Sequence, residues 1–470
     1  VLNSLSPLGL WPVIGHSGAR TMTPLHHLPY RTPEFSGIGG TIKARPEDFA
    51  VQELPIYEPS GQGEHVYCEI QKTGVSTFDA IGLIGNALNV PQKNIGYAGL
   101  KDAHAVTRQH LSIWGTTPEK VQALKIENVA VLWADRHVNK LRMGHLKGNA
   151  FAIKVRDVQP TDVVKVKPVL DELVRRGVPN YFGEQRFGRR GDNHILGAAV
   201  IRQDYPEMLN QLLGRPNPAT DDAQQLGARK AVDENDFSRA MKIWPRSAGM
   251  ERRVLHRLIK TGKAKVAARG IDERIKRLWV SALQSKIFND VVAARVEKGL
   301  HDKLLLGDFA IKHENGAGFM VEDPAIEQPR CDAFEISPTA PLVGYRVTLP
   351  QGEPLKLEEE AFAAVNLRPG DFRREGGERV KGTRRAARVR PTDVDIAGGV
   401  DEHGPFILFK FTLPAGSFAT VLLAELMKPE GKGKPAEEEE SETEEAEPST
   451  HPLGSAAADV DDTGDSDDDK

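Results

Sequence analysis

The 470-residue sequence has few of the residues that build metal sites and disulfide frameworks. Its two cysteines, Cys68 and Cys331, are far apart, so they form neither a CxxC pair nor a zinc signature, and they suit a reducing compartment. The histidines show no HExxH spacing, and no glycine-rich P-loop is present. These absences argue against a zinc enzyme, a disulfide-rich scaffold and a P-loop NTPase.

Long apolar runs and aromatic residues are also scarce. No stretch of about 18 apolar residues occurs, so no membrane span is expected. Residues 431–470 contain no aromatic residue and hold 15 acidic and 3 basic side chains, a net charge of −12. Such a segment is predicted to be disordered. The other 430 residues hold 59 basic and 51 acidic side chains, a net charge of +8, which favours a polyanionic partner.

Hydrophobic periodicity predicts both strands and helices. Polar and apolar side chains alternate over 64–70 and 149–157, which is typical of strands with one buried face. Apolar side chains recur three and four residues apart over 76–88 and 278–299, as in helices with one buried face.

Proline and glycine predict further boundaries. A helix is expected near 168–176, with Pro168 in its first turn and Gly177 just after its end. Residues 376–390 are rich in glycine and charge and are predicted to be a loop. Residues 405–427 predict an apolar strand, a Pro-Ala-Gly turn and a short helix. Strands and helices are predicted at both ends of the chain, and the pattern of helix-like and loop-like segments differs between them. This favours an α+β architecture with an inserted domain.

A single carboxylate lies in a basic stretch, GYAGLKDAHAVTRQH, residues 96–110. Asp102 has Lys101, His104 and Arg108 as close neighbours. Two interpretations are open: a turn-forming aspartate that bonds nearby backbone donors, and a reactive acid. Opposite charges nearby favour the ionised form of a carboxyl group, which suits a nucleophile better than a proton donor. No second acid lies beside it, so the paired-carboxylate chemistry of glycosidases is not predicted.

Three segments, 135–149, 180–194 and 372–390, combine arginine and lysine with histidine or aromatic residues. Each alone fits a solvated surface, but arginine and lysine also neutralise phosphates, and aromatic rings stack on unpaired bases. Together with the basic body they favour RNA or single-stranded nucleic acid. The candidate contacts to an RNA backbone are Arg142, Lys147, Arg186 and Arg189.

Four further residues have both a structural and a functional interpretation. Phe49 and Phe418 lie at turn-like sites, where each is either a core residue or a ring that holds a flat base. Asn149 is either a turn residue or an amide that donates to and accepts from a uracil edge. Lys43 is either a surface lysine or the partner of a carboxylate.

Six segments occur together and in this order: KARPEDFAVQE, YAGLKDAHAVTRQ, LKGNAF, GVPNYFGEQRFG, SALQSKIFN and LPAGSFATVLL. With them the chain resembles the TruD family of tRNA pseudouridine synthases. The resemblance covers about residues 40–427, and residues 205–275 carry no recognised motif.

The resemblance implies an α+β fold. The pseudouridine synthase catalytic domain would have a mixed, largely antiparallel sheet and would be interrupted by an inserted α/β-type TRUD domain. The expected parts are a poorly structured N-terminal extension over 1–39, the catalytic domain in two parts over 40–176 and 390–427, the insertion over 177–389 and a disordered acidic tail over 428–470.

The resemblance also implies the reaction, isomerisation of uridine to pseudouridine in tRNA, usually at uridine 13. Asp102 would be the nucleophile, Phe49, Asn149 and Phe418 would contact the base, and Lys43 would pair with Asp102. Because the isomerisation adds and removes no atoms, no metal or other cofactor is expected. The implied partner is tRNA in the cytoplasm, with no membrane and no required protein partner.

Two other functions would use the same residues. A non-catalytic RNA-binding or RNA-chaperone protein would use the basic surface without chemistry at Asp102. An aspartate-nucleophile hydrolase of small molecules would not need three arginine-rich segments, and salt would hardly affect its activity. RNA binding, in contrast, weakens steeply as salt rises.

Overall fold

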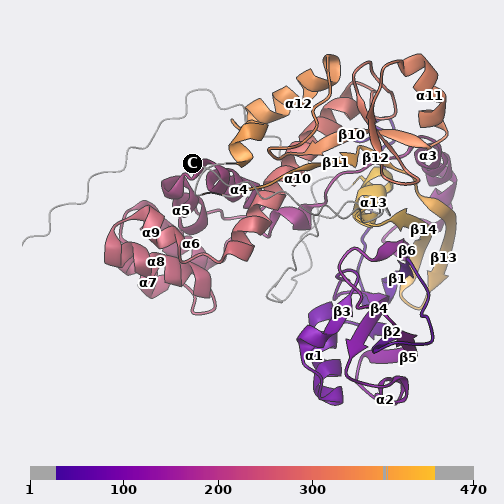
Figure 1. Ribbon diagram of the computed structural model, residues 1–470, viewed down its shortest axis with the longest axis horizontal. Coiled ribbons are helices and arrows are strands. Elements are labelled where there is room, and N and C mark those ends of the chain that lie inside the picture. The colour runs from indigo at the N-terminus through magenta and orange to yellow at the C-terminus, as the bar shows by residue number, and fades with distance from the viewer. Residues whose placement is uncertain (1–27, 374–376, 378, 429–470) are drawn as a thin grey trace, which may run out of the picture.

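The structure is a computed structural model that describes residues 28–373, 377 and 379–428. The predicted acidic tail, from residue 429 on, and the first 27 residues lie outside this described part. Within it, one large sheet forms the lower part of the view in Figure 1 and a smaller sheet forms the upper part. A group of helices lies to one side, joined to the rest by a long helix.

The large sheet has eight strands, in the order β13-β14-β6-β1-β4-β2-β5, with β3 paired to β4. Its strands are β1 (Phe49–Pro55), β2 (His65–Thr73), β3 (Ile95–Tyr97), β4 (Val106–Trp114), β5 (Val129–His137), β6 (Leu146–Arg156), β13 (Thr392–Asp401) and β14 (Gly404–Pro414). Only β1 and β4 pair in parallel; the other strands of this sheet pair antiparallel. The expected mixed, largely antiparallel sheet of an α+β fold is therefore confirmed.

Helices cover two separate regions of this sheet. These helices are α1 (Thr77–Leu88), α2 (Pro118–Gln122), α3 (Val163–Arg176) and α13 (Ala419–Met427). The side chains of α1 pack on β2, β3 and β4 in one apolar cluster, whereas α3 and α13 pack on β1, β6 and β14 in another. The connection between β3 and β4, which carries Asp102, lies at the boundary of these clusters.

Two predicted elements differ from their observed form. Strand β2 was expected to bury one face, but Tyr67 and Cys68, on opposite faces, are 2% and 0% exposed. It is a central strand between β4 and β5, with α1 on one side, so both faces are covered. Helix α3 begins at Val163, so Pro168 lies inside the helix and not in its first turn. Gly177 ends this helix as predicted.

The segment between β6 and β13 contains a second sheet and most of the helices. The four-stranded sheet has the order β11-β10-β8-β9 and is antiparallel. Its strands are β8 (Phe309–Lys312), β9 (Gly318–Met320), β10 (Ile336–Leu342) and β11 (Thr383–Ala386). The helices are α4 (Asn193–Arg202), α5 (Tyr205–Leu213), α6 (Ala223–Asp233), α7 (Phe237–Ile243), α8 (Gly249–Thr261), α9 (Ala264–Ala268), α10 (Glu273–Glu297), α11 (Pro324–Asp332) and α12 (Glu353–Ala364).

Helix α10 is the longest of the described helices, with 25 residues. At 1.5 Å per residue it spans about 37 Å. It begins five residues before the predicted start at 278, because the side chain of Asp272 caps it by accepting from the backbone N–H of Arg274. It connects the helical group α5–α9 to the rest of the molecule (Figure 1).

Both ends of the predicted insertion lie side by side. Strand β7 (Val178–Pro179) pairs antiparallel with β12 (Arg388–Val389) in a two-stranded sheet. A domain inserted into another needs such adjacent entry and exit points. We therefore propose residues 177–389 as the inserted domain.

The predicted loop over 376–390 is wrong in its second half, where β11 and β12 form. The many arginines there disguised the strands, because their charges are satisfied within the protein. Arg384 bonds Glu358, and Arg388 is 1% exposed and donates to backbone oxygens of Arg176 and Cys331.

The described part of the predicted N-terminal extension, residues 28–39, has no helix or strand but is tied to α13. The carboxylate of Glu425 accepts from the backbone N–H groups of Arg31 and Thr32, at 2.7 and 3.2 Å. The N–H groups of Ile38 and Gly39 donate to the last carbonyls of α13. This segment thus supplies hydrogen-bond donors to carbonyl groups at the C-terminal end of α13.

Candidate active site

Asp102 lies in the connection between β3 and β4, with its side chain 23% exposed. Its Oδ1 accepts from the backbone N–H of His104 at 3.0 Å, and its Oδ2 forms an ion pair with the ammonium of Lys43. The imidazole Nε2 of His104 lies 3.0 Å from the backbone oxygen of Lys43. The bond to the His104 N–H fits the turn-forming interpretation of Asp102. Its carboxylate is also ion-paired and partly exposed, and the reactive-acid interpretation stays a prediction.

Lys43 reaches Asp102 from a loop with unusual backbone geometry. Its φ of +56° lies in the left-handed region, which is uncommon for a residue with a side chain and costs free energy unless the surroundings enforce it. The short helix η2 (Pro46–Asp48) follows. Asp48 accepts two hydrogen bonds from the guanidinium of Arg156 on β6, at 2.6 and 2.8 Å. This buried pair fixes the loop against the sheet and so helps to hold Lys43 in place.

Phe49 starts β1 next to this loop and is 5% exposed. Its ring meets that of Phe151 edge to face, with centroids 6.5 Å apart, and the Lys43 ammonium lies 5.2 Å from its centroid. The core interpretation of Phe49 therefore describes the free protein. Its contact with Lys43 nevertheless puts the ring beside the Asp102 ion pair.

Asn149 on β6 lies opposite Glu53 of β1 and Leu413 of β14. Residues directly opposite in an antiparallel sheet point to the same face, so Asn149 shares its face with Phe49 and Phe151. Its Oδ1 is buried and has no hydrogen-bond partner in the protein. A buried acceptor without a partner costs free energy, so it is suited to accept a donor from a bound ligand.

Phe418 precedes α13, where the eight-stranded sheet meets the proposed insertion. Its ring centroid lies 5.9 Å from that of Phe182. The turn before it is held on both sides: the N–H of Ala415 donates to the oxygen of Lys147, and Arg385 of the insertion donates to the oxygen of Gly416. Lys43 thus contacts both Asp102 and Phe49. Asn149 lies on β6, and the turn before Phe418 follows β14, the strand that pairs with β6.

A buried charge network next to Asp102 was missed from the sequence. The Glu53 carboxylate, 1% exposed, accepts from Lys101 Nζ at 2.7 Å and from the backbone N–H of His110 at 3.1 Å. Burial opposes ionisation of Glu53, but hydrogen bonds from His110 and the charge of Lys101 outweigh it and lower the pKa of this carboxyl. The signal was available, because Glu53 continues the inward alternation of Phe49 and Val51 along β1.

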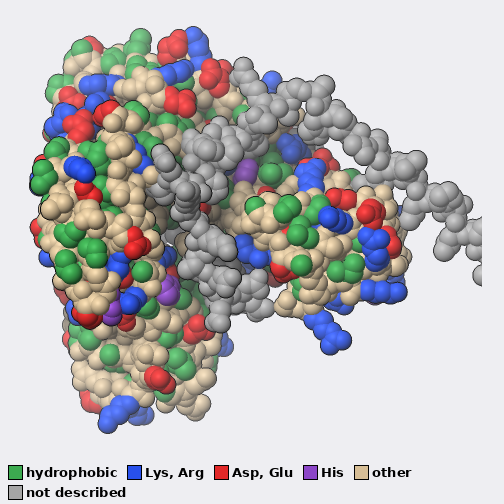
Figure 2. Space-filling view, turned by 180° about the vertical axis from the view of Figure 1, so that it is seen from behind, with side chains coloured by type: hydrophobic (Ala, Val, Ile, Leu, Met, Phe, Trp, Pro, Cys, Tyr) green, Lys and Arg blue, Asp and Glu red, His purple; other side chains and the backbone are tan. Residues whose placement is uncertain are grey.

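The four predicted contacts to an RNA backbone have different surroundings. Arg142 and Lys147 are exposed near the start of β6. Arg189 is exposed and donates to Gln225 at 2.7 Å, whereas Arg186 is partly buried, donates to Ser285 and lies 5.6 Å from the ring of Phe182. On the face shown in Figure 2, lysine and arginine side chains are spread over both lobes, with acidic side chains between them.

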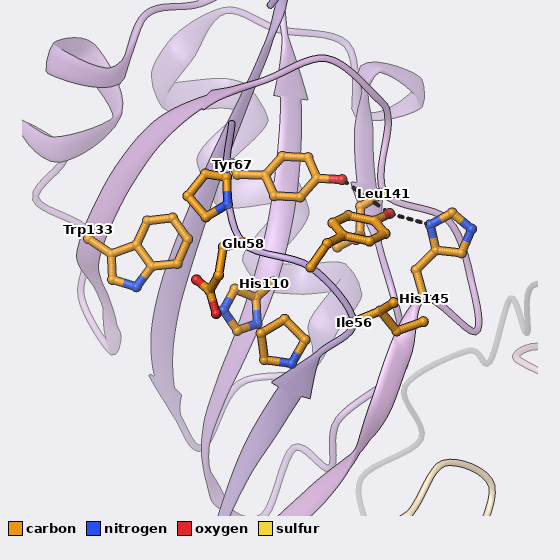
Figure 3. A pocket seen from close by; sticks show the side chains of 10 residues that line it. Ile56, Glu58, Tyr67, His110, Trp133, Leu141 and His145 are labelled. Carbon is orange, nitrogen blue, oxygen red and sulfur yellow. Dashed lines mark hydrogen bonds between the residues drawn. The ribbon is translucent and has the colours of Figure 1, made fainter. Parts of the chain in front are cut away.

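A pocket lies near the first strands and is lined by aromatic and histidine side chains (Figure 3). Tyr57 bonds the Nδ1 of His145 at 2.6 Å, and Tyr67 bonds Tyr57 at 3.4 Å. An adjoining cleft of about 540 Å³ is lined by Glu53, His110 and Trp133, among others. Neither cavity is lined by Asp102, Phe49, Asn149 or Phe418.

Within the described residues, no group of three or more histidine, cysteine, aspartate or glutamate side chains is arranged to hold a metal ion. The same part of the chain contains no helix with the length and apolar character that crossing a bilayer requires.

Comparisons with known proteins give the family. The family model of tRNA pseudouridine synthase D (TruD) matches residues 27–426. The chain belongs to the TruD family. The predicted family and the predicted enzyme class, a pseudouridine synthase and hence an isomerase, are thereby confirmed.

Relatives cover the same region. The chain is 43% identical over 401 residues to the tRNA pseudouridine synthase D of Geobacter sp. strain M21, covering 85% of this chain and 99% of that protein. It is 36% identical over 404 residues to a protein of that name from Thermus thermophilus, covering 86% and 92%. A crystal structure from Methanosarcina mazei, described as a candidate TruD protein, has a TM-score of 0.75 at 28% identity and covers 85% and 96%.

Proposed function

We propose that the protein converts uridine to pseudouridine in tRNA, at uridine 13, with Asp102 as the nucleophile. The observation that carries the proposal is the partly exposed Asp102 carboxylate, ion-paired with Lys43 beside Phe49. An ionised carboxylate with a lone pair available towards solvent can attack, whereas a buried turn aspartate cannot. Family membership supplies the reaction class.

The chemistry conserves all atoms of the nucleotide. Asp102 forms a bond to the nucleotide, at C1′ of the ribose or at C6 of the uracil, and the glycosidic bond from C1′ to N1 breaks. The uracil turns, C5 bonds to C1′, the bond to Asp102 breaks and C5 loses its proton, while N1 holds a proton in the product. Lys43 can neutralise the carboxylate each time it is released.

The uridine must leave its stack to reach Asp102, which costs a few kcal/mol. In this proposal the ring of Phe418 stacks on the base and Asn149 Oδ1 accepts from the N3–H of uracil. That bond would satisfy an acceptor that has no partner in the free protein. Phe49, whose ring contacts Lys43, supports the site from within the core.

The proposal includes tRNA as the partner and phosphate contacts from exposed Arg142 and Lys147. We also propose the cytoplasm as the compartment. Both cysteines are buried free thiols, which is compatible with a reducing environment.

The test is chemical mapping of pseudouridine in tRNA treated with wild-type protein, Asp102→Asn and Asp395→Asn. Asp395 lies on β13, is exposed and pairs with Lys410 of β14. Its variant therefore controls for the loss of one carboxylate charge. We expect product at uridine 13 with wild type and the control, and none with Asp102→Asn, which should still bind tRNA. Normal product from Asp102→Asn would contradict the assigned nucleophile, and product only at another uridine would contradict the assigned position.

A further inference from the structure

Lys72 is a buried lysine that neither the predicted site nor the family comparison assigns. It is the penultimate residue of β2 and is 0% exposed. A fully buried ammonium loses its hydration and is retained only where its donors find acceptors. Its location close to the Asp102 loop raises the question of what it holds.

The three acceptors of the Lys72 ammonium are all backbone carbonyls. Its Nζ donates to Asp102 at 2.8 Å, to Lys101 at 3.3 Å and to Val75 at 2.5 Å. Two of these carbonyls belong to the connection between β3 and β4, residues 98–105, here called the catalytic loop. One of the two is the carbonyl of Asp102, the proposed nucleophile. An ammonium has three donors, so these three acceptors use its full capacity.

A second group fixes the same loop from the same side. The hydroxyl of Thr77, at the start of α1, accepts from the backbone N–H of Lys101 at 2.9 Å and donates to Gln109 at 3.0 Å. The peptide groups on both sides of Lys101 are therefore fixed, one through its N–H and the other through its C=O. Lys72 and Thr77 belong to one short segment, QKTGVST, in which Gly74 makes a left-handed turn with φ of +68°.

We propose that Lys72 is a positioning residue for the reaction, holding the backbone of Asp102 so that its carboxylate faces Lys43 and the substrate. The inference rests on the proposed function of Asp102. The lysine touches no substrate; it acts through the loop. Because only two dihedral angles separate the Asp102 backbone from its carboxylate, an error of about 1 Å in the loop carries over to the attacking oxygen, and such errors can cost about 100-fold in rate.

The charge of Lys72 adds an electrostatic effect. Burial lowers the pKa of Lys72 to about 8, with Asp102 and Asp79 opposing that shift and Lys101 supporting it. These are the charged groups that face it from the catalytic loop and from α1. Below about pH 8 the ammonium keeps all three donors; above it the neutral amine has two, and one carbonyl of the loop loses its partner.

The experiment compares Lys72→Ala, Asp102→Asn and a matched control, Lys286→Ala. Lys286 is 3% exposed, bonds Asp290 within α10 and lies in the insertion, so its variant also removes a buried ammonium. Steady-state kinetics on tRNA should show kcat lower by about 100-fold in Lys72→Ala. KM should stay within about threefold, because an interaction made only for the chemical step leaves ground-state binding intact. Lys286→Ala, measured as folded protein, should keep the wild-type kcat.

Chemical rescue separates positioning from a general loss of structure. The alanine variant leaves a buried space that n-propylammonium fills, restoring three N–H donors; kcat should rise severalfold with its concentration. Tetramethylammonium has the same charge and no N–H, and it should not rescue. If Lys72→Ala does not fold, Lys72→Met keeps the length and apolar stem, and its kcat and KM are measured in the same way.

Each outcome of these measurements supports or overturns the inference about Lys72. Wild-type kcat in folded Lys72→Ala or Lys72→Met overturns the inference, as does an equal loss of kcat in Lys286→Ala or equal rescue by tetramethylammonium. If Asp102→Asn makes no product while the Lys72 variants have the wild-type kcat, only this inference fails. If Asp102→Asn turns over normally, the proposed function of Asp102 fails first, and the inference with it.

Discussion

Among single residues, the ion pair of Lys43 and Asp102 is the contact on which the chemistry depends. It joins two segments 59 positions apart and is formed by a lysine with left-handed backbone geometry. Strain of this kind persists where the surroundings enforce it, and it is concentrated at functional sites. The contact gives the single acid of this basic stretch a partner, because the Lys43 ammonium pairs with the Asp102 carboxylate and holds it in place.

Lys43→Met should lower kcat by about 10- to 100-fold, equivalent to roughly 1.4–2.8 kcal/mol, because Asp102 loses its opposite charge. Lys43→Arg should retain part of the activity, since the charge stays but the guanidinium is larger. Single-turnover pseudouridine formation on saturating tRNA measures this. Equal rates for wild type and Lys43→Met would contradict a role for the ion pair.

Asn149→Ala should separate stability from function. Because Asn149 Oδ1 is buried without a partner, removing it should leave the thermal midpoint unchanged or raise it slightly. Loss of the proposed uracil bond should lower kcat/KM by about 10-fold or more. Calorimetry and steady-state kinetics on the same preparation test both halves. A destabilised variant with normal kcat/KM would show that Asn149 is structural.

At the level of elements, the active site depends on ties between segments that are distant in sequence. Arg156 of β6 bonds Asp48 before β1 and also Asp401 at the β13–β14 turn. The pair with Asp48 is buried on both sides, at 7% and 2% side-chain exposure. It therefore matters for stability, whereas the more exposed contact with Asp401 matters less.

Arg156→Met should cost about 3–5 kcal/mol of unfolding free energy, because it leaves Asp48 as an uncompensated buried charge. The double variant Arg156→Met with Asp48→Leu should recover much of this loss, since both charges are then removed. Denaturant unfolding of both proteins and wild type gives the values. A loss below about 1 kcal/mol in the single variant would mean that water reaches the Asp48 carboxylate.

Glu425 makes the packing of residues 28–39 on α13 sensitive to pH. Burial raises the pKa of Glu425 to about 7, although bonds from Thr32 and the charge of Lys428 oppose the shift. A raised folded pKa means that the associated stability is full below the unfolded value of 4.5 and is lost as pH rises through about 7. Wild type should therefore lose thermal stability relative to Glu425→Gln as pH rises from 4.5 to about 7. If the melting temperatures of the two proteins changed in the same way with pH, this prediction would be contradicted.

The elements also show what the sequence could predict. Helix α1 and strands β6 and β14 follow their hydrophobic periods, and Ser76 caps α1 as its type suggests. Strands β11 and β12 were missed because their arginines are polar in sequence and satisfied only by tertiary partners such as Glu358. Pro168 gave the wrong helix start, because a proline can also occupy a helix interior when the lost hydrogen bond is tolerated.

On the scale of the whole molecule, two sheet-based parts meet near α13 (Figure 1), where Arg385 of the proposed insertion donates to the oxygen of Gly416. The motifs predicted Asp102, Lys43 and Phe49 as site residues, and in the structure Lys43 contacts the other two. Glu53 and Lys72 escaped notice because each is one residue in an ordinary strand. The alternation along β1 places Glu53 on an inward face, but its partners, and those of Lys72, come from the pairing of β1, β2 and β4.

Binding of tRNA should depend strongly on salt. Replacing Arg142 and Lys147 with glutamine should weaken binding and make the slope of log K against log salt shallower by roughly 0.7–0.9 for each phosphate that is no longer neutralised. The kcat at saturating tRNA should not change, since both side chains are exposed and Asp102 is bonded by Lys43, Lys72 and His104. Titrations at several salt concentrations measure the slope. An unchanged slope would place the RNA backbone elsewhere.

The most direct test of the central claim is the single-turnover rate of pseudouridine formation with Asp102→Asn at saturating tRNA. Asparagine keeps the shape of the side chain and can still accept from the His104 N–H, so binding should be retained while the attacking charge is lost. We predict a rate lower by at least about 10³-fold with an unchanged dissociation constant. A rate within about tenfold of wild type would contradict the account.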